Sequence, residues 1–185
     1  ITFEAHRAHG SGFVYAPELV MTNAHVVAGV TNPVVTIHNQ KRSAKVVLFD
    51  PRLDIAVLSV KGLTTKHLKF ADEPRKSDQA AIIGYPDNGP LTASSARVRS
   101  VMTIKSPNIF QEGEYDREVI SIRGQVLPGN SGGPLVSPKG EVFGMVFAAS
   151  ATDESTGYAL TAAQVTVAAG SGFHSRKPVS TGKCL

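Results

Sequence analysis

Short runs of β-branched residues, separated by turn residues, recur along most of this chain of 185 residues. The runs are rich in Val and Ile and are bounded by Pro, Gly, Asn and Asp, which is typical of strands in an antiparallel sheet. Helical periodicity is almost absent. The pattern predicts an all-β fold of the barrel or sandwich type, with strands in 12–21, 33–37, 44–49, 55–60, 80–84, 91–104, 119–122, 135–136, 142–148 and 158–160.

A polar stretch divides this strand pattern into two halves. Residues 71–78 read A-D-E-P-R-K-S-D, a composition that favours a linker. Because a similar number of strands is expected on each side, we expect two barrels. We place an N-terminal barrel at 1–75, a C-terminal barrel at 76–161, and a helix with a tail at 162–185.

Two helical signals interrupt the strands. Residues 24–28 follow Asn23 and are long enough for one helical turn. Thr161 and Gln164 have the spacing of a capping box, and Gly170 is a suitable C-terminal stop. We therefore expect a C-terminal helix over 162–169, followed by an irregular polar tail.

Composition and charge exclude several classes of function. The net charge is +4, but the basic residues are scattered and aromatic residues make up only 6%, which argues against nucleic-acid binding. One Cys and six dispersed His residues give no zinc-ligand spacing, and no cofactor or metal is implied. No apolar run is long enough for a transmembrane helix. Since the chain starts at Ile1 without Met, we expect it to be a portion of a longer protein, with any anchor or export signal upstream.

Residues 129–133 read G-N-S-G-G, so a single serine hydroxyl is surrounded by backbone without side chains. One interpretation is a tight turn in which the glycines supply positive φ angles. The other is nucleophilic catalysis, in which Ser131 attacks a carbonyl and the N–H groups of Gly129 and Ser131 bind the oxyanion. The second interpretation requires a base and an orienting acid elsewhere in the chain.

His25 and Asp54 are the candidates for those two roles. His25 lies at the end of an apolar strand, and Asp54 enters a strongly apolar strand, where a carboxylate must be hydrogen-bonded or paired. Asp54 either caps the turn after Pro51 or holds the His25 ring in the correct tautomer, so that His25 accepts the proton of Ser131. The three residues follow one another at separations of 29 and 77 residues.

The segments T-N-A-H-V-V, D-I-A-V-L and G-N-S-G-G-P-L-V resemble the three motif blocks of the chymotrypsin-like (trypsin-fold) serine proteases, which include the HtrA proteases. The resemblance covers most of the chain. It implies two six-stranded Greek-key β-barrels with a short C-terminal helix. It also implies a monomeric serine endopeptidase domain that cleaves proteins or peptides through an acyl-enzyme and needs no cofactor.

The resemblance also assigns roles to individual residues. Ser131 is the nucleophile, His25 is the general base and then acid, and Asp54 orients His25. The N–H groups of Gly129 and Ser131 form the oxyanion hole. In the trypsin group, an acidic residue six positions before the nucleophile selects Lys or Arg. Here that position is Gln125, which is neutral, so we do not expect trypsin-like cleavage. The implied substrate-binding residues are Gln125, Val146, Phe147, Ala148, Gly157 and Tyr158.

A closer resemblance is to the MarP family, the membrane-anchored acid-resistance proteases of mycobacteria and related actinobacteria. It rests on G-S-G-F-V, M-T-N-A-H-V-V-A-G, F-A-D-E-P, G-Y-P-D-N-G and G-Y-A-L-T-A. This family implies a periplasmic protease domain behind an inner-membrane segment, acting in stress or acid resistance. It also implies a disulfide between the start and the end of the domain. Cys184 matches the end position and is otherwise either a free thiol or half of a bridge to an upstream segment.

Two competing interpretations remain. Residues 129–133 also fit G-x-S-x-G, the nucleophile elbow of α/β-hydrolases, with Ser131, Asp153 and His174 in the required order. Pro134 is poorly placed for the helix that such an elbow needs, and alternating βα patterns are missing. The second is a latent or non-catalytic binding module on the protease fold. The filled triad argues against it, although a latent conformation is compatible with the same residues.

Overall fold

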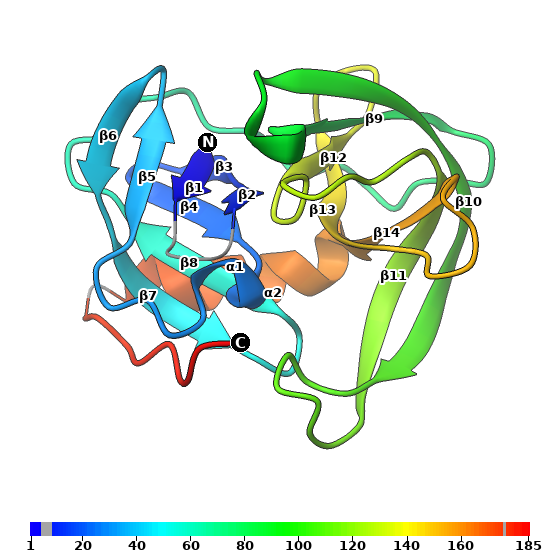
Figure 1. Ribbon diagram of the computed structural model, residues 1–185. Helices are drawn as coiled ribbons and strands as arrows, with labels where there is room; N and C mark the ends of the chain where they lie inside the picture. Colours follow the sequence, from blue (N-terminus) through cyan, green and yellow to red (C-terminus); the bar gives the residue numbers. More distant parts are fainter. Residues whose placement is uncertain (5–8, 176) are drawn as a thin grey trace.

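The computed structural model describes residues 1–4, 9–175 and 177–185, and its strands form two groups that lie side by side (Figure 1). The N-terminal group contains β1 (Thr2–Glu4), β2 (His9–Ser11), β3 (Phe13–Ala16), β4 (Leu19–Thr22), β5 (Val34–Ile37), β6 (Gln40–Ser43), β7 (Lys45–Asp50) and β8 (Ile55–Ser59). The C-terminal group contains β9 (Gln79–Gly84), β10 (Thr92–Ser106), β11 (Tyr115–Arg123), β12 (Pro134–Val136), β13 (Val142–Ala149) and β14 (Thr156–Thr161). The helical segments are α1 (Ala24–Val27), the 3₁₀ turn η1 (Pro86–Asn88) and α2 (Ala162–His174).

The C-terminal group is a closed antiparallel barrel with the strand order β10-β11-β14-β13-β12-β9. Inward side chains of alternating positions fill it, as β10 illustrates, where Val98 is buried between the exposed Arg97 and Arg99. The same period-two alternation is what the sequence pattern predicts for a half-buried strand. The expected six-stranded C-terminal barrel is therefore confirmed, and its core includes Ile82, Ile120, Ile122, Leu135 and Val146.

The N-terminal group consists of two sheets with the strand orders β2-β1-β5-β6 and β3-β4-β8-β7. Only Gly12 separates β2 from β3, and only Ala44 separates β6 from β7. Two bent strands thus pass from one sheet to the other and complete a barrel of six strands. Position 12 requires glycine, because a β-carbon there would lie 2.6 Å from the Phe3 ring and 2.7 Å from Met21 O. The expected barrel is confirmed, with a division into two sheets that the sequence pattern does not predict.

The two helices begin where the sequence predicts. Thr161 caps α2, since its Oγ1 accepts a hydrogen bond of 3.2 Å from Gln164 N. The expected end before Gly170 is wrong, because α2 continues to His174. Packing explains the extension: Gly172 lies against Val57 and Tyr15, where any larger residue would collide.

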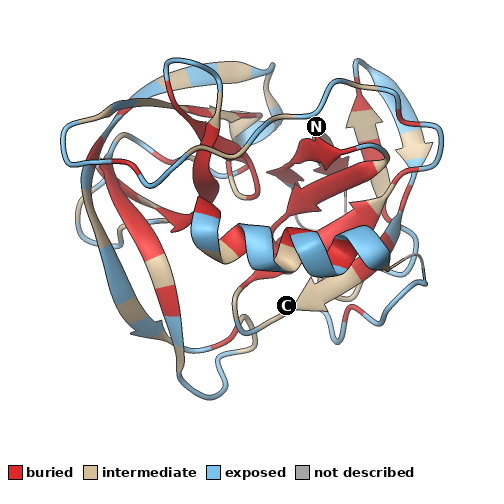
Figure 2. Ribbon diagram, turned by 180° about the vertical axis from the view of Figure 1, so that it is seen from behind, coloured by how far each residue is buried: buried red, intermediate tan, exposed pale blue. Residues whose placement is uncertain are grey.

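Helix α2 lies behind both strand groups and contacts strands of each, namely β4, β7 and β8 of the first and β13 and β14 of the second (Figures 1 and 2). Its inner face is buried and its outer face is exposed (Figure 2). One apolar cluster runs beneath it from Met21 and Val57 through Val165 to Met145 and Leu160. This shared core holds the two strand groups in one relative position. Within the described ranges, no helix combines the length and apolar character needed to cross a membrane.

Two valines of α2 give a matched test of this shared core. Val165 is fully buried, whereas Val167 is 72% exposed. Replacing Val165 by Ala removes buried methyl groups and leaves a cavity, so we expect the free energy of unfolding to fall by about 2 kcal/mol. Val167→Ala should change it by less than about 0.5 kcal/mol. Urea unfolding measures both values, and equal effects of the two substitutions would contradict the assignment of α2 as a core element.

Candidate active site

His25 and Asp54 are joined by two hydrogen bonds. His25 Nδ1 lies 2.7 Å from Asp54 Oδ2, and the backbone N–H of His25 donates to Asp54 Oδ1 over 2.9 Å. The Asp54 side chain is 4% exposed and that of His25 is 29% exposed. A carboxylate in this position favours the tautomer with the proton on Nδ1, which leaves Nε2 of His25 free to act as the base.

Local structure fixes this pair from both sides. His25 is placed by α1, which begins directly after β4. Asp54 ends the turn between β7 and β8 with a φ of 60°, an uncommon conformation for a residue with a side chain. The Asn23 amide donates a hydrogen bond of 2.9 Å to the backbone carbonyl of Asp54 and so ties the two segments together. Asn23 is a site residue that the sequence analysis used only as the start of a helix.

The turn that carries Ser131 packs against the segment that precedes His25. A β-carbon at Gly132 would collide with Ser11 O and with Thr22 Oγ1, so this position requires glycine for close approach as well as for its φ of +83°. The backbone N–H of Ser11 donates to Ser131 O over 2.8 Å. Ser131 itself is half-buried. The structure thus brings the Ser131 turn of the C-terminal group against β2 and against the junction of β4 and α1, which leads into His25.

Hydrogen bonds on the carbonyl side orient the peptide groups of this turn. Pro128 O accepts from Asp87 N over 2.8 Å, and Asn130 O accepts from Gly133 N over 2.9 Å. In a trans peptide the N–H points away from the C=O, so the N–H groups of Gly129 and Ser131 point away from these partners. Among the described residues, neither N–H donates a hydrogen bond. They are two free donors, two residues apart in one turn, and free backbone donors are what an oxyanion hole requires.

The side chains of His25 and Ser131 are not linked by a direct hydrogen bond in the part of the chain that the structure describes. In proteases without substrate this bond is often long and shortens only in the complex. The arrangement is therefore compatible with proton transfer from Ser131 to His25, although the bond itself is not formed.

The residues assigned to substrate binding divide into two sets. In the first set, Val146 is bonded to the two residues that follow Ser131. Its O accepts from Gly132 N over 2.8 Å, and its N donates to Gly133 O over 2.9 Å. A bulge between Val146 and Ala148 leaves Phe147 without an opposite residue on β14. Bulges are common beside active sites, where they redirect a side chain.

The second set lies near the turn between β13 and β14. Ala148 and Tyr158 are opposite each other in the β13–β14 ladder, and Gln125 is exposed. Gly157 packs against Val126, whose side chain a β-carbon at Gly157 would overlap. Val126 is therefore a direct neighbour of this set. No pattern in the sequence indicates this contact.

A hollow of about 320 Å³ lies beside the triad, lined by His25, Asp54, Ser106, Pro107, Asn108, Ile109, Gln111, Arg117, Phe147 and Ala148. Arg117 is its buried cation, and its Nε and Nη2 donate to Arg52 O and Pro107 O over 3.0 and 2.9 Å. Burial lowers the pKa of Arg117, and the carboxylates of Asp54 and Asp50 oppose that shift. The sequence analysis missed Arg117, since nothing in its local context distinguishes it from the other arginines of the strands.

The α/β-hydrolase interpretation is wrong. Asp153 binds Ser155 and Thr156 in the turn before β14, with both hydroxyl contacts at 2.7 Å, and lies 3.6 Å from Arg99. His174 is exposed at the end of α2 and lies against Phe173. Neither residue is bonded to Ser131, and Ser131 is followed by a strand and not by a helix.

Cys184 is exposed and has no disulfide partner in the described ranges. It lies beside Gly29, whose N–H donates to Thr181 O over 3.1 Å, so the chain end is bound close to the segment that follows α1. The disulfide stays a prediction. Across the residues that the structure describes, no group of His, Cys, Asp and Glu is arranged to hold a metal ion.

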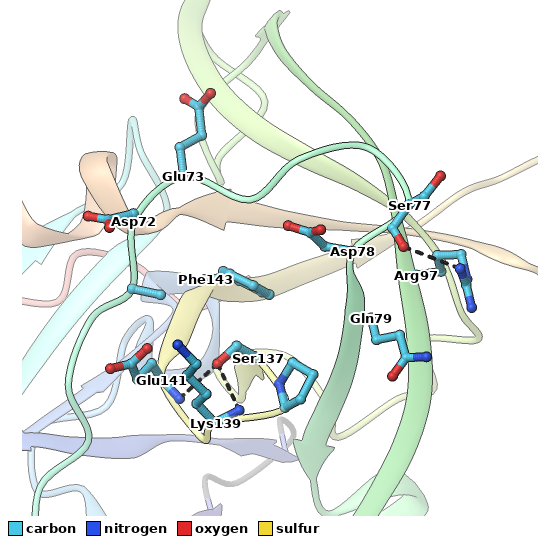
Figure 3. Close-up of a pocket in the computed structure, with 12 residues that line it drawn as sticks. Asp72, Glu73, Ser77, Asp78, Gln79, Arg97, Ser137, Lys139, Glu141 and Phe143 are labelled. Carbon is cyan, nitrogen blue, oxygen red and sulfur yellow. Dashed lines mark hydrogen bonds between the residues drawn. The ribbon is translucent and has the colours of Figure 1, made fainter.

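A larger cavity of about 580 Å³ lies on the C-terminal barrel between the 71–79 segment, β10 and the turn before β13 (Figure 3). Ser137 Oγ accepts hydrogen bonds from the backbone N–H groups of Lys139 and Glu141 at its floor (Figure 3). None of the residues assigned to catalysis or substrate binding lines this cavity. It therefore has no part in the site around Ser131.

Known proteins are similar to this chain in sequence. The serine protease Rv3671c of Mycobacterium tuberculosis H37Rv is 42% identical over 178 residues, which are 95% of this chain and 45% of that protein. This chain thus spans less than half of that relative. A probable periplasmic DegP-like serine endoprotease of Ectopseudomonas mendocina is 35% identical over 140 residues, or 74% of this chain and 28% of that protein.

Solved structures agree with the sequence relatives. The active form of the M. tuberculosis Rv3671c protease superposes with a TM-score of 0.94 and 38% identity, covering 99% of this chain and 83% of that chain. An inactive form of the same protease gives a TM-score of 0.84 and covers 92% of this chain and 86% of that chain. A family model described as "Trypsin-like peptidase domain" matches residues 10–145. Since this match includes His25, Asp54 and Ser131 and covers most of the chain, the chain belongs to the trypsin-like serine peptidase family.

Proposed function

We propose that this chain is a serine endopeptidase that uses His25, Asp54 and Ser131 as its catalytic triad. The observation that carries the proposal is the doubly bonded His25–Asp54 pair beside a Ser131 turn with two free N–H donors. Family membership and the similarity to Rv3671c support it.

The mechanism follows from these contacts. Ser131 Oγ attacks the scissile carbonyl carbon while its proton passes to Nε2 of His25, and Asp54 stabilises the imidazolium that forms. The N–H groups of Gly129 and Ser131 bind the oxyanion of the tetrahedral intermediate. His25 then protonates the leaving amine, which leaves an acyl-enzyme on Ser131. Water, deprotonated by His25, attacks the ester and releases the acid.

The alternative of a latent or non-catalytic module is less well supported. The chain superposes better on the active form of Rv3671c than on an inactive form, with TM-scores of 0.94 and 0.84. The free N–H groups of Gly129 and Ser131 also favour an assembled site.

We extend the proposal to the setting of the full-length protein. The resemblance to the MarP family supports a periplasmic domain that is anchored to the inner membrane, acts on proteins or peptides during acid or other stress, and is itself monomeric. The DegP-like relatives, whose names describe them as probably periplasmic, support the same compartment. Cys184 would then form its disulfide outside the cytoplasm, where disulfides persist.

A fluorophosphonate probe tests whether the triad is assembled. We expect covalent labelling at Ser131, located by mass spectrometry, because the probe reacts only with a serine that is activated by a base. Ser131→Ala should abolish labelling. Folded wild-type protein that remains unlabelled would contradict the proposal and favour a latent module.

Asp54→Asn tests the pairing with His25. The amide cannot hold the same tautomer or stabilise the imidazolium, so kcat for a peptide substrate should fall on the order of 10⁴-fold. The controls are Asp153→Asn and His174→Ala, which should leave kcat within about twofold because neither residue contacts the Ser131 turn. A large loss in these controls with an active Asp54→Asn variant would refute the assignment.

A further inference from the structure

Ser11 links the two strand groups at the Ser131 turn. It ends β2 in the N-terminal group and is 1% exposed. Its Oγ donates a hydrogen bond of 2.6 Å to Gly129 O, and its backbone N–H donates to Ser131 O over 2.8 Å. A single buried residue thus holds both ends of the turn that carries the free N–H groups.

The direction of the Ser11 hydroxyl bond is determined by a third partner. Tyr85 N donates to Ser11 Oγ over 3.0 Å, and a backbone N–H can only donate. The Ser11 hydroxyl therefore accepts from Tyr85 N–H and donates its own proton to Gly129 O. The result is a chain of two hydrogen bonds that runs from Tyr85 N–H through the hydroxyl to the Gly129 carbonyl. Ser11 is itself fixed, because Thr22 Oγ1 donates to its carbonyl oxygen over 2.7 Å.

The turn needs this support because of Gly129. Its φ of +93° is accessible to glycine, but so are many other backbone conformations. The Pro128–Gly129 peptide is held by Asp87, as described above. The Gly129–Asn130 peptide is held at both of its polar atoms, since Asn130 N donates to Leu127 O over 3.0 Å and Gly129 O accepts from Ser11 Oγ. Without the Ser11 hydroxyl, the peptides on either side of Gly129 lose one of these three restraints. The buried Gly129 carbonyl would then lack this partner and Tyr85 N–H would lose its acceptor, so a rearranged turn would satisfy these groups better.

We propose that Ser11 is a positioning residue for the oxyanion hole: its hydroxyl holds the Gly129–Asn130 peptide, which connects the two peptides that carry the N–H groups of Gly129 and Ser131, so that both N–H groups face the substrate carbonyl. Ser11 acts through the turn and touches neither substrate nor the reacting atoms. Because the bond joins β2 to the C-terminal barrel, the geometry of the hole is coupled to the packing of the two strand groups. This inference rests on the proposed peptidase function.

The kinetic test is Ser11→Ala, with active sites counted by fluorophosphonate titration so that unfolded protein does not enter the rates. An oxyanion hole acts in the transition state, so kcat should fall about tenfold to a hundredfold while KM changes less than about threefold. Binding of a peptide aldehyde, whose adduct with Ser131 carries the oxyanion, should weaken in the same proportion as kcat. Ser11→Cys, which replaces the hydroxyl by a weaker donor, should lie between Ala and wild type.

The matched control is Thr181→Val. Thr181 is buried, and its Oγ1 donates to Val30 O over 3.1 Å, away from the Ser131 turn. This variant loses a buried hydroxyl–carbonyl bond, as Ser11→Ala does, and should keep its kcat and aldehyde affinity. If Ser11→Ala changes only thermal stability, or lowers kcat no more than Thr181→Val does, Ser11 is a structural residue and the proposal is overturned.

A second readout does not depend on activity. In ¹⁵N-labelled protein, the Gly129 and Ser131 amides should each give one resonance in the wild type and in Thr181→Val. They should broaden or double in Ser11→Ala as the turn samples other conformations. Unchanged resonances would overturn the role of Ser11 even in a protein that hydrolyses nothing. An inactive wild type whose amides respond to Ser11→Ala would instead refute the peptidase function and leave the role of Ser11 in place.

Discussion

The candidate active site depends on two separate strand groups that keep one relative position. His25 and Asp54 come from the N-terminal group, whereas Ser131 comes from the C-terminal barrel. Apolar packing under α2 holds the groups together, and it has little directional preference. Directional contacts are supplied by Ser11, whose hydrogen bonds join the two groups at the Ser131 turn.

Some of the unusual backbone conformations of the chain occur at the candidate site. Asp54, Asp87 and Gly129 have φ values of 60°, 50° and 93°, and each lies in the triad or in a segment that orients the Ser131 turn. Such conformations persist only where surrounding contacts determine them. Here the contacts are specific hydrogen bonds: Asn23 to the Asp54 carbonyl, Asp87 to the Pro128 carbonyl, and Ser11 to the Gly129 carbonyl. The loops that carry the candidate catalytic residues are thus held by polar groups outside the proposed triad.

The sequence predicted the fold class and the candidate triad because both depend on local patterns. Strand periodicity is a property of a few neighbouring residues, and His25, Asp54 and Ser131 each stand in a distinctive short motif. The end of α2 was predicted wrongly at Gly170. The helix continues because Gly172 packs against Val57 of β8, a contact that the local sequence does not indicate. Ser11 and Val126 were missed for the same reason. The Ser11–Gly129 bond spans 118 residues, and no local pattern indicates which distant carbonyl a buried hydroxyl meets.

The bent strands at Gly12 and Ala44 have a consequence for the surface of the molecule. They carry the chain from one N-terminal sheet to the other, so the edge strands of the two sheets are joined in pairs. The C-terminal barrel is closed. Within the described ranges, one long strand is the exception: β10 pairs with β9 over residues 92–97, but its residues 100–106 pair with β11 alone. Free edges of this kind can recruit further strands. An extended polypeptide approaching this molecule therefore finds an open edge at the end of β10, on the side that β9 leaves uncovered.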